Sequence, residues 1–94
     1  MHVAVLVLEL RFGDCRTLRQ KRRRLEKIIA KVRRHFNVAM LEVDRHDRPE
    51  ESILGVAAVG RARREAREVL ERIADALGCH PRAELVRHAI RDLC

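Results

Sequence analysis

The feature that most constrains the fold is a nearly continuous apolar run close to the start of the chain, HVAVLVLEL at residues 2–10. The run is short and rich in β-branched valine, which favours a strand over a helix. Apolar residues occupy both of its faces, so we expect a central strand that is at least partly covered on each side. A second run of this kind, SILGVAAVG at residues 52–60, predicts a second central strand.

Two amphipathic helices are predicted, one between these runs and one after them. Thr17 stands three residues before Gln20, the spacing of a capping box, and this places a helix start there. Asn37 ends that helix. Six apolar residues share one face of it at the helical period: Leu18, Leu25, Ile28, Ile29, Val32 and Phe36. A second apolar stripe runs over residues 62–77 and is closed by Gly78.

Two further segments complete the predicted fold. VAMLEVD at residues 38–44 alternates as a half-buried strand does, and a polar loop follows it. Residues 82–93 have apolar spacing that suits a helix after Pro81, whereas the preceding β-α-β-β-α order requires a closing strand; we predict the strand.

These elements predict a single domain over residues 1–94 of the α+β class. Right-handed connections make β-α-β-β-α-β a ferredoxin-like two-layer sandwich, with a four-stranded antiparallel sheet in order 4-1-3-2 and two helices on one face.

Three blocks of the sequence resemble the YlxP-like bacterial family of unknown function: RTLRQKRR at 16–23, FNVAMLEVD at 36–44 and LGVAAVG at 54–60. They occur in the family's order and spacing, and the resemblance extends over most of residues 2–78. It implies a ferredoxin-like fold. It also implies a link to RNA or the ribosome, because the family's genes tend to sit near those for translation and ribosome-maturation factors. No activity transfers through the resemblance, because none is assigned to a member of the family.

The net charge of +7 is concentrated in one segment. Residues 16–34 hold ten Lys or Arg side chains and one acid, Glu26, whereas the rest of the chain holds 11 bases and 13 acids. On a helix, like charges three and four residues apart repel one another, and a bound polyanion would relieve this repulsion while releasing counterions. The bases that face away from the apolar stripe are candidates for binding nucleic acid: Arg19, Arg23, Arg24, Lys27, Lys31 and Arg34. A solvated face, relieved by acids elsewhere in the fold, is the alternative interpretation.

The scarcity of aromatic residues indicates how such a partner would be bound. Phe12 and Phe36 are the only aromatics, and Phe36 lies on the apolar stripe, so the sheet lacks a platform for stacking bases. We therefore expect backbone and shape recognition of structured RNA, in a ribosome-associated role. A second hypothesis is a protein-interaction or dimerisation module, because a two-layer fold leaves apolar residues of both central strands on an open sheet face, and we expect Val38 and Met40 to add to it.

No catalytic constellation is found. Ser52 is the only serine, and the four glycines form no phosphate-binding motif, so we predict neither an enzyme nor a cofactor or small-molecule substrate. Glu42, Asp44 and His46 would share a strand face and are the only candidate metal ligands. Their spacing matches no established metal motif, and neighbouring arginines are the more ordinary partners, so no metal site is predicted.

Three widely spaced cysteines form no CxxC pair and are expected to be reduced thiols. The chain has no apolar run near the roughly 20 residues that span a bilayer, and no signal-peptide pattern at its start. We expect a cytoplasmic protein without a membrane partner.

Overall fold

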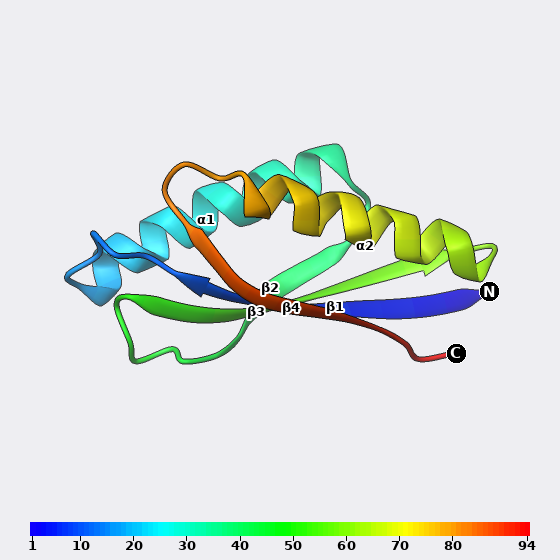
Figure 1. The fold of residues 1–94 in the computed structure, drawn as a ribbon, viewed down its shortest axis with the longest axis horizontal. Coiled ribbons are helices and arrows are strands. Elements are labelled where there is room, and N and C mark those ends of the chain that lie inside the picture. Colours follow the sequence, from blue (N-terminus) through cyan, green and yellow to red (C-terminus); the bar gives the residue numbers. More distant parts are fainter.

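The computed structural model describes residues 1–94 and has the predicted element order. The elements are β1 (His2–Arg11), α1 (Leu18–His35), β2 (Ala39–Asp44), β3 (Glu51–Gly60), α2 (Arg63–Gly78) and β4 (Glu84–Asp92). The four strands form one antiparallel sheet in the order β2-β3-β1-β4, which is the predicted order read from the other edge. Both helices lie on the same side of the sheet (Figure 1), so the ferredoxin-like prediction is confirmed.

The core lies between the sheet and the helices, and strand alternation builds it. Leu6, Leu8 and Leu10 of β1 are fully buried, and their neighbours in sequence are not. Ser52 of β3 is also fully buried on this side, where its hydroxyl donates to the Glu42 carboxylate at 2.6 Å. The two apolar runs therefore form adjacent central strands, as their composition indicates.

The first helix begins where the capping box predicts. The Gln20 amide donates to the Thr17 hydroxyl at 3.1 Å, and the Thr17 amide donates to the Gln20 side chain at 3.2 Å. α1 ends at His35, one turn after Val32, because Phe36 takes up an extended backbone conformation. This end fixes the length of the basic helix at 18 residues, ten of which are arginine, lysine or histidine.

The closing segment is a strand, as predicted, and its pairing with β1 contains one irregularity. Leu85 pairs with Leu10 and Ile90 with Leu6, with a register shift between Glu9 and Leu10. An extra residue in one strand lets two positions of odd separation face the same side. Leu85 and Ile90, five residues apart, both pack on the core for this reason.

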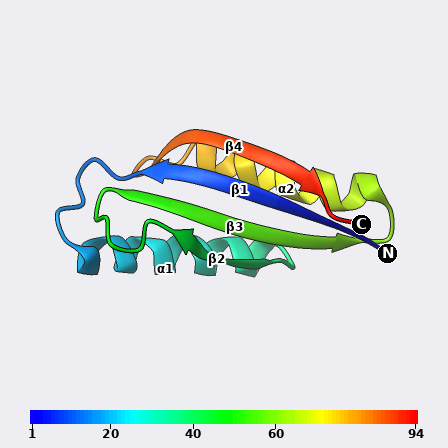
Figure 2. The same ribbon diagram turned by 90° about the horizontal axis from the view of Figure 1, so that it is seen from below.

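The side of the sheet away from the helices carries apolar side chains, as predicted for the central strands β1 and β3. In β2 the prediction is wrong: Met40 is buried in the core, and Leu41 and Val43 are on the open side instead. Val7, Leu41, Val43 and Val59 are 44%, 58%, 49% and 63% exposed. Figure 2 shows this side, with no helix in front of it. Neither helix has the length and apolar character needed to cross a membrane.

The two ends of the chain lie side by side. The Val3 amide donates to the Cys94 carbonyl at 3.0 Å, and the Leu93 amide donates to the Val3 carbonyl at 2.8 Å. Both ends are at the edge of the molecule opposite the loop between β1 and α1 (Figures 1 and 2).

Candidate nucleic-acid interface

A groove of about 820 Å³ runs between α1 and α2 on the helical side of the sheet. α1 lies over the half of the sheet that contains β2, and α2 over the half that contains β4 (Figure 2). The groove is lined by one side of α1, the last turn of α2, the loop that follows it and the loop before α1. The predicted basic helix therefore forms one wall of a concave site.

The floor of the groove is apolar. It includes Ile28 and Val32 of α1 and Leu77 of α2, and all three are less than a tenth exposed. Phe36 lines one end and packs partly buried against the core, with the Arg72 guanidinium 5.6 Å from its ring centre. A ligand here would contact hydrocarbon as well as charge.

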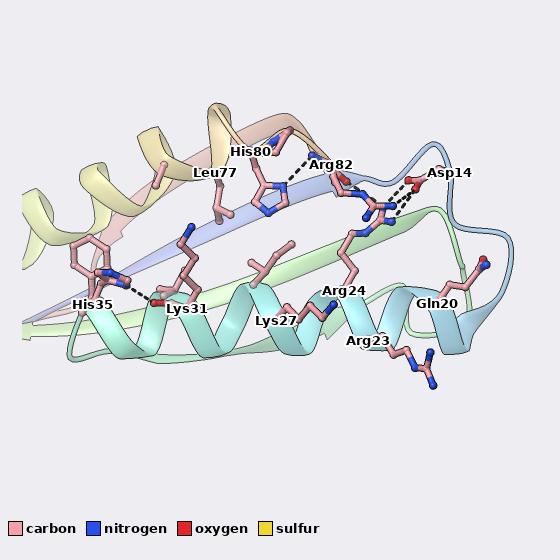
Figure 3. A pocket seen from close by; sticks show the side chains of 15 residues that line it. Asp14, Gln20, Arg23, Arg24, Lys27, Lys31, His35, Leu77, His80 and Arg82 are labelled. Carbon is pink, nitrogen blue, oxygen red and sulfur yellow. Dashed lines mark hydrogen bonds and ion pairs between the residues drawn. The ribbon is translucent and has the colours of Figure 1, made fainter.

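Exposed cations stand along the α1 rim. Arg23, Lys27 and Lys31, here called the rim row, follow one another at four-residue intervals, or about 6 Å along the helix axis. None of the three makes an ion pair. Figure 3 shows Lys31 directed toward α2, whereas Arg23 extends outward from the edge of the groove.

At the end of the groove opposite Phe36, the Asp14 carboxylate binds Arg24 and Arg82, and these three residues are here called the clamp. Asp14 accepts hydrogen bonds from Arg24 at 2.7 Å and from Arg82 at 3.1 Å, and so joins α1 to the loop before β4 (Figure 3). Arg24 also donates to the Arg82 carbonyl at 3.2 Å. Bonds from the two guanidinium groups hold the pKa of Asp14 well below its usual value. Arg24 and Arg82 are thus both paired with Asp14, and the unpaired cations of the groove are those of the rim row.

His80 lies inside the groove, close to three of its cations. Burial is the largest cause that lowers the pKa of His80 below its usual value, followed by the charges of Lys31, Arg24 and Arg82. Its Nδ1 lies 3.1 Å from the Arg82 amide nitrogen and accepts that hydrogen bond. The groove therefore disfavours a further positive charge and favours an anion.

Most of the basic segment is unpaired. Of its ten Lys and Arg side chains only Lys21 and Arg24 make ion pairs. The other eight make none: Arg16, Arg19, Arg22, Arg23, Lys27, Lys31, Arg33 and Arg34. The acids of α2 and of the 45–51 loop do not reach them, so the like-charge crowding expected from the sequence is present in the fold.

Lys21 is the exception that sequence reasoning missed. It is only 2% exposed, and its Nζ donates to the carbonyls of Arg45 and Glu51 at 2.7 and 3.0 Å and contacts Glu42 at 2.9 Å. A lysine on the apolar side of a basic helix usually extends toward solvent. Here it is a structural cation that joins α1 to the ends of β2 and β3.

Of the three candidate metal ligands the structure brings together Glu42 and His46, whose Oε1 and Nδ1 atoms lie 3.0 Å apart, and separates Asp44 from them. A register shift between Glu42 and Asp44 breaks the alternation that would have placed them on one face. Burial acts to raise the pKa of Glu42, but hydrogen bonds from Ser52, Lys21 and His46 outweigh it and lower the pKa. Asp44 instead accepts a bond from the Arg45 amide. No group of three or more His, Cys, Asp or Glu side chains is placed to hold a metal ion.

Four of the six predicted contact residues line the groove, namely Arg23, Arg24, Lys27 and Lys31. Arg19 and Arg34 are exposed on α1 but lie outside it. Arg24 does not face open solvent as predicted, because the clamp pulls it inward and leaves its side chain 14% exposed.

Four polar residues of the groove were missed by sequence reasoning: Asp14, His35, His80 and Arg82. One signal for two of them exists in the sequence. In a ferredoxin-like fold the loops after β1 and before β4 meet at one end of the sheet, so an acid at 14 and a base at 82 are placed close together.

Comparison with known proteins gives two matches. A family model described as "Protein of unknown function (DUF503)" matches residues 3–90. The chain is also 30% identical to "Uncharacterized protein YlxP" of Bacillus subtilis (strain 168) over 71 residues, which cover 76% of this chain and 77% of that protein. Neither description names a ligand or a reaction.

Proposed function

The chain belongs to the DUF503 family of proteins of unknown function, whose description assigns no activity, and we propose from its geometry that it binds RNA through α1. The observation that supports this proposal is the set of eight unpaired cations on and beside that helix. The proposal includes a cytoplasmic location and a ribosome-associated role.

The cations of α1 differ from most other cations of the molecule, because they form few ion pairs. Surface arginines near acids form ion pairs throughout this molecule, as Arg63 and Arg67 do with Asp92. On α1 the one acid, Glu26, forms no ion pair with the rim row, and repulsion between neighbours costs a few tenths of a kcal/mol per pair. Each phosphate that binds such a cation relieves this cost and releases condensed counterions, which gives affinity independent of base sequence.

A salt titration of RNA binding tests the proposal. We expect binding to a structured RNA to weaken as salt rises, and the triple variant Arg23→Glu/Lys27→Glu/Lys31→Glu to lose most of the affinity and most of the slope. The matched control is Arg61→Glu/Arg64→Glu/Arg91→Glu, because these arginines are also exposed and unpaired but lie off α1. Equal losses in the two triple variants would mean that net charge alone governs binding, and would contradict the proposal.

A second candidate function uses the open sheet face. Leu41 and Val59 are more than half exposed on it, and Val7 and Val43 add to the same apolar surface. A closed homodimer would bury this patch once on each subunit. This proposal places a partner chain on the side of the sheet opposite α1, so both functions can operate in one molecule.

Light scattering over a range of protein concentrations tests the dimer. We expect a mass that rises toward twice the chain mass, and Leu41→Lys/Val59→Lys should return it to one chain mass. Leu18→Lys is the control, since Leu18 is 37% exposed but lies at the start of α1. A wild-type mass that stays at one chain up to high concentration rejects the dimer.

A further inference from the structure

We propose that the groove between α1 and α2 receives one unpaired strand of the RNA, with neighbouring phosphates along the rim row and sugars and bases against the apolar floor. This inference rests on the proposed function and narrows it. It places the contact in a loop, bulge or end of the RNA and not on a double helix.

The spacing of the rim row supports a strand that runs along α1. Arg23, Lys27 and Lys31 are separated by one helical turn each, about 6 Å of rise. Successive phosphates of an extended strand are separated by a similar distance, so one strand can meet the three cations in turn. Because long side chains are flexible, Arg23 can turn inward from its outward position at the edge.

The floor of the groove distinguishes a single strand from a duplex. A duplex presents its charged backbone on the outside and keeps its bases stacked inside, so it has no apolar surface to offer to Ile28, Val32 and Leu77. An unpaired nucleotide exposes its base and the carbon side of its sugar. Only this form of RNA uses both the cations and the hydrocarbon of the site.

The charge of the groove also fits a strand. Five cations and one carboxylate line it, and the carboxylate, Asp14, is already bound to Arg24 and Arg82. The unpaired charge therefore lies along the α1 wall, whereas α2 contributes no Lys or Arg to the lining, only Ala76 and the floor residue Leu77. This asymmetry matches the two sides of a strand, which are a phosphate edge and a base edge.

The groove lacks an aromatic stack at its centre, and this sets its selectivity. Phe36 lies at one end and His80 beside the clamp, and no aromatic residue lies between them on the floor. Specific recognition of unstacked bases usually relies on such stacking. We expect the site to distinguish unpaired from paired RNA while showing little preference among base sequences.

Binding measurements with matched probes test this inference. The probes are a single-stranded RNA, a hairpin with a wide loop, the same stem closed by a minimal loop, and a blunt duplex of equal length. We expect the single strand and the wide-loop hairpin to bind at least about tenfold more tightly than the duplex at one salt concentration. A log–log salt slope near −2 is expected for the single strand, from three phosphates at about 0.7 each.

Variants on different sides of α1 test where the RNA strand binds. Lys27→Glu/Lys31→Glu should weaken single-strand binding about tenfold or more and flatten the slope by about 1.4. Arg22→Glu/Arg33→Glu is the matched control: these two arginines are also unpaired, and they project about 140–160° round the helix from the lysines, outside the groove. The control should change affinity less than about threefold.

A charge-neutral variant tests the floor and opening of the groove. Ala76→Leu fills the groove from the α2 side and should weaken single-strand binding severalfold, whereas Ala30→Leu, at an exposed α1 position outside the groove, should not. Circular dichroism spectra and thermal melts of every variant distinguish a loss of folding from a loss of binding.

Three outcomes would overturn the inference. The first two, which leave the proposed function standing, are equal affinity for duplex and single strand, and equal losses in the Lys27/Lys31 and Arg22/Arg33 variants. The third is displacement of the RNA by polyglutamate at equal charge concentration, because hydrocarbon contact would then contribute nothing. Absence of binding to all four RNAs would instead remove the proposed function itself.

Discussion

The Lys and Arg side chains of residues 16–34 form ion pairs with acidic residues less often than those of the rest of the molecule do. Outside residues 16–34, seven of eleven Lys or Arg side chains make ion pairs, and inside that segment two of ten do. Arginine is abundant in both regions, so composition does not cause the difference. Exposed ion pairs contribute little to stability wherever they occur. The contrast therefore concerns which charges remain available to a partner.

The same contrast exists within α1 itself. Lys21 is buried against two carbonyls and a carboxylate, and Lys27 and Lys31, six and ten residues later, are exposed and unpaired. One lysine of this helix has a structural role, and the other two are available for binding.

The largest expected effect is on stability, and it distinguishes the buried Lys21 from the exposed Lys27. Lys21→Met should lower the free energy of unfolding by about 3–5 kcal/mol, because it leaves Glu42 and the two carbonyls without their buried donor. Lys27→Met should change it by no more than about 0.5 kcal/mol. Urea denaturation at pH 7 measures both. Similar losses for the two variants would show that the distinction between buried and exposed lysines of α1 is wrong.

A smaller effect comes from releasing paired arginines. Asp14→Asn frees Arg24 and Arg82 inside the groove, so we expect tighter RNA binding and a salt slope steeper by up to about 1.4. Asp92→Asn is its counterpart, because Asp92 also bridges two arginines, Arg63 and Arg67, away from the groove. Fluorescence anisotropy over a salt series measures both variants. A gain of equal size from Asp92→Asn would mean that the position of an unpaired cation does not matter.

The smallest expected effect is a pH dependence of binding through His80. In the unbound protein, burial and three nearby cations lower the pKa of His80 from 6.5. A bound phosphate cancels the repulsion from those cations and raises this pKa in the complex, so binding takes up a proton. Affinity should then rise as the pH falls through the higher pKa of the complex and level off below the pKa of the unbound protein. For a difference of one pKa unit the gain is at most about tenfold.

His80→Gln provides the control for that measurement. It keeps a polar side chain in the groove but removes the titration, so the affinity of this variant should stay constant between pH 7.5 and pH 5.5. A wild-type profile that persists in His80→Gln would assign the pH dependence to another group and contradict this role of His80.

The sequence was sufficient to predict the fold because its local signals agree with one another. The capping box at Thr17, the two apolar runs and the alternation of residues 38–44 each specify an element that the structure contains. The closing strand was ambiguous for a definite reason. Leu85, Val86, Ala89 and Ile90 recur at intervals of three and four residues, which suits a helix, and only their pairing with β1 makes the segment a strand.

The candidate site was only half predictable. A helical wheel finds the rim row, because that row depends on the period of one element. It does not find the clamp or His80, because Asp14, Arg24 and Arg82 come together only after the sheet has set the distance between α1 and the loop before β4. The wheel also gives no sign that Lys21 is buried, because its partners are 21 to 30 residues away in the sequence.

The neighbouring ends of the chain determine how the molecule would respond to force. Val3 is bonded to Leu93 and Cys94, so β1 starts where β4 finishes. The hydrogen bonds of an antiparallel pair run perpendicular to the strands. Tension applied to the two ends would therefore load the β1–β4 bonds one after another, as in a zipper, and not all at once in shear. A machine that pulls on the C-terminal end would meet this weak mechanical direction first, and would remove the edge strand β4 before it disturbs the rim row.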